Sequence, residues 1–196
     1  MEQQIRPHRA TTDKNLQATR EAIHEYNNLL ETDETIWGSI RRRTLRTRVK
    51  QFLYKAMHGT QKIGRFWRNI PNNKQRELCT ICRVTESMEH ILVNCQATPR
   101  RQIWSMAREI WPHEQSAWPE INVGTILGCG ILSPPTNNQR DPNERENERE
   151  NERGNAPKQI QGKTQLLQIL ISESAHLIWA LRCERVIANP DHRHSE

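Results

Sequence analysis

The chain is poor in hydrophobic residues and has no apolar segment long enough to cross a bilayer. Hydrophobic residues make up 34% of its 196 positions, which is low for a globular protein, so part of the chain is expected to lie outside the core. The longest apolar run covers residues 177–181, whereas a membrane-spanning helix needs roughly 20 residues. No apolar signal segment follows Met1. We therefore expect an intracellular protein, nuclear or cytoplasmic and not secreted, that contacts no membrane.

The sequence also lacks side-chain arrangements that are typical of enzymes. Glu89 stands beside His90 but does not form a His-Glu-x-x-His pair, and the glycines of residues 124–130 lack the nucleotide-binding spacing. The few aspartates are scattered and argue against a two-metal carboxylate site: Asp13, Asp33, Asp141 and Asp191. The sequence thus predicts a protein that is not an enzyme and has no small-molecule substrate.

The chain does contain a close group of three cysteines and one histidine. Cys79, Cys82, His90 and Cys95 follow the spacing Cys-x2-Cys-x7-His-x4-Cys. Two residues between the first cysteines allow a tight turn, and a short helix capped by Thr85 would carry His90 to the same point. Because His90 and Cys95 are about 140° apart on an ideal helix, Cys95 is expected at or beyond the helix end.

Three thiolates and one imidazole fill all four positions of a tetrahedral zinc ion. We therefore predict one structural Zn²⁺ without an open position for a reactive water. Such a site contributes roughly 10–16 kcal/mol of apparent free energy, enough to decide whether residues 75–100 fold. The alternative is that these cysteines are ordinary small buried residues. Cys129 and Cys183 lie far from the group and are expected to be buried or free thiols.

Apolar residues at helical spacing predict a mainly α fold. The expected helices cover residues 13–28, 35–58, 62–70, 99–111 and 164–188. Residues 122–131 are expected to be an irregular packed segment. The helix of residues 164–188 is apolar nearly all round its middle and should be buried against the other helices. The expected fold class is a small helical domain with a structural CCHC zinc element, a disordered low-complexity linker and a C-terminal helix.

The linker is predicted from a repeated tetrapeptide. Asn-Glu-Arg-Glu occurs at residues 143–146 and again at 147–150, in a stretch with almost no apolar residue, which cannot offset the entropy of ordering. The expected organisation is a flexible tail (1–12), a helical zinc-binding domain (13–132) with its zinc element at 76–98, the linker (133–160), a helix packing on the domain (161–189) and a second tail (190–196).

A long basic span precedes the cysteines. No acidic residue occurs between Thr35 and Arg76, in a chain whose net charge is +6. We interpret this span as a surface that contacts the phosphate backbone of RNA or DNA with little sequence preference. The candidate contact residues are Arg41, Arg42, Arg43, Arg46, Arg48, Lys50, Lys55, Lys62, Arg65 and Arg68. The alternative is a solvated face whose long side chains surround a core. Phe66 and Trp67 are candidates for base stacking, although such aromatics are more commonly core residues.

Several segments resemble a known family. Residues 35–42, 52–58 and 62–67 resemble the region after the ribonuclease H domain in fungal non-LTR (LINE-like) retrotransposon polyproteins. The run Glu-Ser-Met-Glu-His-Ile-Leu at 86–92, together with the cysteine spacing, is similar to the reverse-transcriptase zinc-binding domain of these polyproteins. Residues 126–130 and 172–179 resemble stretches further downstream. The resemblance implies a zinc module that associates with nucleic acid, whereas polymerase and ribonuclease H activities belong to other domains.

Two alternatives to nucleic-acid binding remain open from the sequence. The chain is also compatible with a protein-interaction or scaffold module whose basic face is only solvated. A non-functional retroelement remnant is the other alternative, since the Asn-Glu-Arg-Glu repeat departs from the family pattern.

Overall fold

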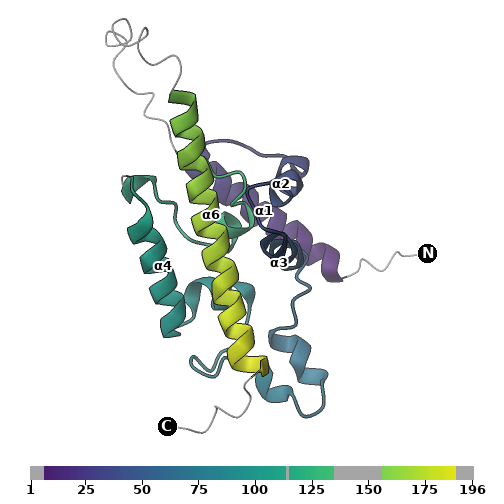
Figure 1. Cartoon of the computed structure of the whole chain (residues 1–196). Coiled ribbons are helices and arrows are strands. Elements are labelled where there is room, and N and C mark those ends of the chain that lie inside the picture. The colour runs from purple at the N-terminus through teal and green to yellow at the C-terminus, as the bar shows by residue number, and fades with distance from the viewer. Residues whose placement is uncertain (1–6, 114, 135–155, 189–196) are drawn as a thin grey trace, which may run out of the picture.

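The computed structural model describes residues 7–113, 115–134 and 156–188 (Figure 1). The α-helices in this part of the chain are α1 (Pro7–Asn27), α2 (Asp33–Ile40), α3 (Thr47–Met57), α4 (Thr98–Ile110), α5 (Val123–Leu127) and α6 (Ala156–Cys183). Short 3₁₀ helices are η1 (Gly64–Asn69), η2 (Lys74–Glu77) and η4 (Gln115–Ala117), and π-helical turns are η3 (His90–Asn94) and η6 (Glu184–Ala188). The described residues contain no strand, only a bridge between Leu78 and Thr85. The predicted mainly α fold is confirmed.

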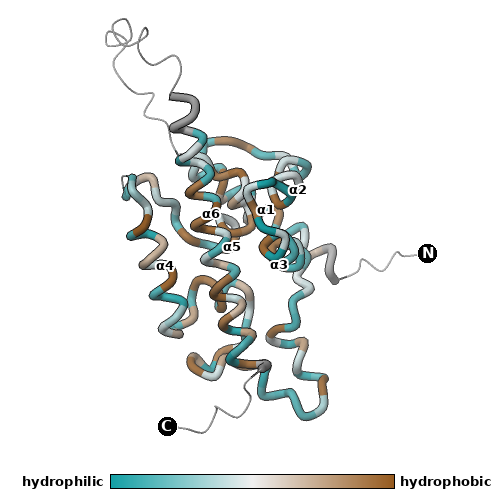
Figure 2. Tube along the Cα trace, in the orientation of Figure 1, coloured by the Kyte–Doolittle hydropathy of each residue, from teal (hydrophilic) through white to brown (hydrophobic). Residues whose placement is uncertain are grey.

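The long helix α6 is the central element. It packs against α3, α4, α5 and η3, with α4 on one side and α1 to α3 on the other (Figure 1). Leu167, Ile171 and Ile178 form its buried stripe. The colour of the tube alternates along α6 in Figure 2, as expected for a helix with one buried face. The helix packs against other helices as expected, but part of its apolar surface faces solvent, since Ile169 and Leu177 are exposed. None of the helices in the described ranges is long and apolar enough to span a membrane.

A buried glutamine joins α6 to two loops. The Gln168 amide nitrogen donates to the backbone carbonyls of Gly130 (3.0 Å) and Leu132 (3.1 Å). Its amide oxygen accepts from the hydroxyl of Thr44 (3.3 Å). Because these bonds satisfy the buried amide, Gln168 fixes the segment after α5 and the loop between α2 and α3 onto α6.

The single helix predicted over residues 35–58 is two helices. Residues 41–46 form a connection between α2 and α3, so Arg41, Arg42 and Arg43 are not helical. The reason lies in the apolar pattern: Ile36 and Leu45 are nine residues apart and would point in opposite directions on one straight helix. The break lets both side chains reach one core, and both are at least 97% buried.

Other predicted boundaries shift as well. The helix α1 begins at Pro7, so residues 7–12 are not the loose tail that was predicted. Residues 122–131 are less irregular than expected, since they contain α5. The helix α6 begins at Ala156, inside the predicted linker. Residues 135–155 of that linker, residues 1–6 and the predicted tail of 190–196 lie outside the described residues.

The close contact between α5 and α1 depends on Gly124. A Cβ atom at this position would lie 2.2 Å from the carbonyl oxygen of Ala18. We expect Gly124→Ala to lower the free energy of unfolding by about 1–3 kcal/mol, because the backbone of α1 would have to move. Urea denaturation measures the change. The control is Gly162→Ala in α6, where nothing lies within 4 Å, and it should be neutral or stabilising. Equal stability of the Gly124→Ala variant and the parent would contradict this prediction.

Candidate metal centre

The first two predicted ligands lie in a tight turn that follows η2. The backbone N–H of Cys79 donates to the carbonyl of Val84 (2.8 Å), and the N–H of Arg83 donates to the carbonyl of Cys79 (2.9 Å). Arg83 has a left-handed φ of 59°, which reverses the chain direction after Cys82. The N–H of Cys82 points at the Cys79 sulfur (3.5 Å). These bonds hold the two thiols of the Cys-x2-Cys segment next to each other.

The other two ligands lie at the two ends of the π-helical turn η3. The N–H of Cys95 donates to the carbonyl of His90 (2.6 Å), and Cys95 itself has extended backbone angles. A π turn joins residues five apart, so it brings Cys95 next to His90, which an α-helix would not do. The predicted position of Cys95 at the helix end is confirmed, and the turn explains the four-residue spacing. From α4, Arg100 Nε donates to the Cys95 carbonyl (2.6 Å) and Trp104 Nε1 to the Leu92 carbonyl (2.8 Å).

The prediction that Thr85 caps this helix is wrong. Thr85 pairs with Leu78 in the antiparallel bridge, which closes the cysteine turn. The hydroxyl of Ser87 instead accepts the backbone N–H of His90 (3.0 Å), three residues later. This is the geometry of an N-cap serine, so the helix starts two residues later than predicted.

The four side chains converge on one point. Their ligand atoms all lie within 4.8 Å of one another, and the Cys95 sulfur is 3.8 Å from that of Cys79 and 4.0 Å from that of Cys82. Sulfurs at about 2.3 Å from a tetrahedral ion would be about 3.8 Å apart, so the spacing fits a metal. The buried Nε2 of His90 has no hydrogen-bond partner among the described residues, as expected of a ligand atom. The group could therefore hold a metal ion.

The protein environment shifts the pKa values of three of the four side chains, and not all in the same direction. Burial lowers the pKa of His90, which keeps the imidazole in the neutral form that binds metal ions. Burial raises the pKa of Cys95 to about 11. Burial also acts to raise the pKa of Cys79, but hydrogen bonds from the backbone of Cys82 and Ile81 outweigh it and lower that pKa. Cys79 is therefore the thiol that loses its proton more readily of the two.

The chain was compared with known proteins. It matches no protein-family model, no curated protein and no solved structure. What the Cys3His group can do is therefore argued from the chain's own geometry and chemistry.

The other two cysteines lie outside this group. Cys129 is fully buried, and burial raises its pKa to about 12. Cys183 is half-buried near the end of α6, and burial raises its pKa as well. Neither belongs to the Cys3His group, as predicted.

The ten predicted nucleic-acid contacts are distributed over α3, η1 and the loops beside them. Nine are exposed and Lys50 is half-buried. Two have acidic partners: Arg46 pairs with Glu173 of α6, and Arg68 pairs with Glu77. The span lacks acidic residues in sequence, but in the structure it is partly neutralised. We define the basic surface as the eight residues that form no salt bridge among the described residues: Arg41, Arg42, Arg43, Arg48, Lys50, Lys55, Lys62 and Arg65.

The two aromatic candidates for base stacking differ in exposure. Trp67 is buried and its indole N–H donates to the carbonyl of Lys62 (2.8 Å), so it is a structural residue. Phe66 is 44% exposed, with the Lys62 ammonium 5.6 Å from its ring centre. Only Phe66 of this pair offers a ring to a ligand.

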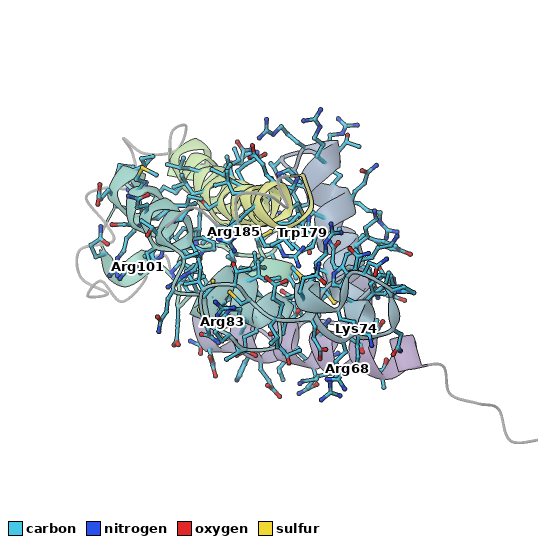
Figure 3. All side chains as sticks on the ribbon, turned by 90° about the horizontal axis from the view of Figure 1, so that it is seen from below. Arg68, Lys74, Arg83, Arg101, Trp179 and Arg185 are labelled. Atoms are coloured by element: carbon cyan, nitrogen blue, oxygen red, sulfur yellow. The ribbon has the colours of Figure 1, made fainter. Side chains whose placement is uncertain are left out.

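Sequence reasoning missed basic residues at the end of the molecule that carries the metal group. Figure 3 shows Arg83 of the cysteine turn, Arg101 of α4 and Arg185 of η6 around this end. They come from three separate elements, so no run of charge in the sequence revealed them. It also missed the buried ion pair between Glu86 and Arg182, which are 96 residues apart. The sequence feature that could have indicated this ion pair is Arg182, which directly follows the apolar run of residues 177–181 in α6.

Proposed function

We propose that the metal held by Cys79, Cys82, His90 and Cys95 is a single structural zinc ion. Thiolate and imidazole donors in tetrahedral geometry favour zinc over hard cations such as Mg²⁺ or Ca²⁺. Because the protein would supply all four ligands, the ion has no position for substrate or water. The zinc therefore fixes the fold of residues 75–100, and we assign the module no catalytic role.

We further propose that the chain is a nucleic-acid-binding module derived from the zinc-binding region of a non-LTR retrotransposon reverse transcriptase. The observation that carries the proposal is the basic surface, whose eight cations lie on α3, η1 and the loops beside them and form no salt bridge in the described part of the chain. Cations held in this way attract a phosphate backbone of any sequence. The resemblance of residues 86–92 supports the retroelement origin.

A salt titration tests this function. We expect zinc-loaded protein to bind single-stranded RNA at low salt, with a logarithmic affinity that falls linearly with the logarithm of salt concentration. Changing Arg41, Arg42, Arg43 and Arg48 together to Gln should reduce the slope by about 3, because each lost phosphate contact contributes about 0.7–0.9. Fluorescence anisotropy at several salt concentrations measures both quantities.

The matched control removes the same charge elsewhere. Lys14, Arg101, Arg108 and Lys163 are exposed on α1, α4 and α6, and their joint change to Gln should leave most of the slope intact. No binding at low salt by zinc-loaded protein would refute the function. Equal losses in both variants would mean that net charge and not the basic surface carries binding.

Protein interaction is the second candidate, and one observation favours it. Leu78, Ile81 and Val84 are 44–47% exposed on the cysteine turn. Three aliphatic side chains within seven residues form an apolar tip of the kind found at protein contacts. Two results together would favour this function. The parent chain would capture a protein partner that the Ile81→Ser, Val84→Ser variant does not, and the parent chain would not bind RNA.

A further inference from the structure

A cavity of about 290 Å³ lies between the metal-binding element (residues 76–98, which contain the Cys3His group), the start of α4 and the C-terminal end of α6. Aliphatic side chains make much of its wall: Ile91 of η3, Pro99 of α4, and Ile178 and Leu181 of α6. Cys95 of the Cys3His group also lines the cavity, so the two sites are adjacent. The cavity is large enough for a small organic molecule, and neither the metal nor the basic surface gives it a role.

Three guanidinium groups also line this cavity: those of Arg100, Arg182 and Arg185. Arg182 is only 3% exposed, and its Nε donates to Oε2 of Glu86 (3.0 Å). Its Nη1 is buried without a hydrogen-bond partner among the described residues. The thiol of Cys183, which interacts with the same guanidinium, is a weak acceptor. Nε of Arg185 is buried and unpartnered within the same described ranges.

The charges around the cavity leave it positive. Glu86 neutralises Arg182, and Glu184 is exposed, so solvent screens its charge. Arg100 is partly engaged, because its Nε donates to the carbonyl of Cys95. Buried donors of native proteins are almost always satisfied. The two unpartnered guanidinium N–H groups belong to residues that line one cavity, and such a cavity suits a ligand that supplies acceptors. Arginine forks suit the oxygens of phosphate groups in particular.

We propose that this cavity binds a phosphate monoester. The guanidinium groups of Arg182 and Arg185 donate to the phosphate oxygens, and that of Arg100 adds positive charge. The organic part of the ligand lies against the aliphatic wall formed by Ile178 and Leu181. Two sources share this chemistry: a free organic phosphate, and the 5′-phosphate at the end of a nucleic-acid strand. The site is separate from the basic surface and does not depend on the proposed function.

Phenyl phosphate is the probe, because its phosphate tests the guanidinium groups and its ring tests the aliphatic wall. Calorimetry on the metal-loaded chain at constant ionic strength should show saturable binding that is tighter than that of inorganic phosphate, whereas phenol should not bind. We expect Arg185→Gln to weaken phenyl phosphate binding by about tenfold, the effect of losing one charge-assisted hydrogen bond. Arg108→Gln is the matched control, since Arg108 is exposed on α4 and does not line the cavity.

Two further measurements keep the test decisive. Arg182→Lys retains a charge but loses the fork, so it should also weaken binding, and circular dichroism shows whether the variant is folded. If a 5′-phosphorylated oligonucleotide displaces phenyl phosphate and its 5′-hydroxyl form does not, the ligand is the end of a strand. Displacement by nucleoside monophosphates alone supports a free ligand. Absence of saturable binding, or equal losses in Arg185→Gln and Arg108→Gln, overturns the proposal.

Discussion

Cys95→Ser is expected to abolish metal binding and to unfold the region of residues 75–100. Cys95 closes the π-helical turn and its sulfur is within 4.0 Å of both other cysteine sulfurs, so a serine hydroxyl would leave the ion with three ligands. Structural zinc contributes roughly 10–16 kcal/mol of apparent free energy in small domains, far more than the short helices of this region gain by packing. Native mass spectrometry counts the metal, and limited proteolysis reports the unfolding.

Cys183→Ser is the matched control for this experiment. Cys183 is a half-buried thiol outside the Cys3His group, and its change should leave one metal ion per chain. A chelator added to the parent chain should reproduce the proteolysis pattern of Cys95→Ser. The metal-free parent protein should be cleaved within residues 75–100 more readily than the metal-loaded protein. Equal resistance of the two forms to protease would show that the metal does not stabilise this region.

The same centre should respond to pH in a defined direction. Burial raises the pKa of Cys95 to about 11, so without metal this group is a protonated thiol at neutral pH. Zinc binds the thiolate, and binding must therefore release the proton of Cys95. As pH falls, protons compete better for the ligands and the affinity for metal decreases. This competition would make loss of structure on acidification coincide with loss of metal.

The sequence predicted contacts between residues that are close in the chain better than contacts between residues that are distant in the chain. The candidate metal ligands lie within residues 79–95, and their spacing alone placed Cys95 at a helix end. The break between α2 and α3 was missed, although Ile36 and Leu45 on opposite faces of one helix indicated it. The pairing of Arg46 with Glu173 could not be predicted, because it joins α6 to a residue 127 positions earlier and depends on how the helices pack.

The buried ion pair between Glu86 and Arg182 joins the locally folded metal-binding element to a helix that is distant in the sequence. Glu86 precedes the turn that carries His90, and Arg182 is near the end of α6, so the pair fixes the metal-binding element onto the central helix. The side chains are 1% and 3% exposed, which means that both charges have left water. A pair of this kind is costly to break from one side, because the remaining charge stays buried without its partner.

We therefore expect Glu86→Gln to lower the free energy of unfolding by about 3–5 kcal/mol, measured by urea denaturation of the metal-loaded chain. The double change Glu86→Leu, Arg182→Met removes both charges and should recover most of this loss, since a well-packed apolar pair replaces them. The control is Glu173→Gln, which breaks the pair with the exposed Arg46 and should have a much smaller effect. If Glu86→Gln is no more harmful than Glu173→Gln, the buried pair does not hold the metal-binding element in place. If the double variant is as unstable as Glu86→Gln, the pair contributes through more than its charges, because removing the unpaired guanidinium would then have relieved nothing.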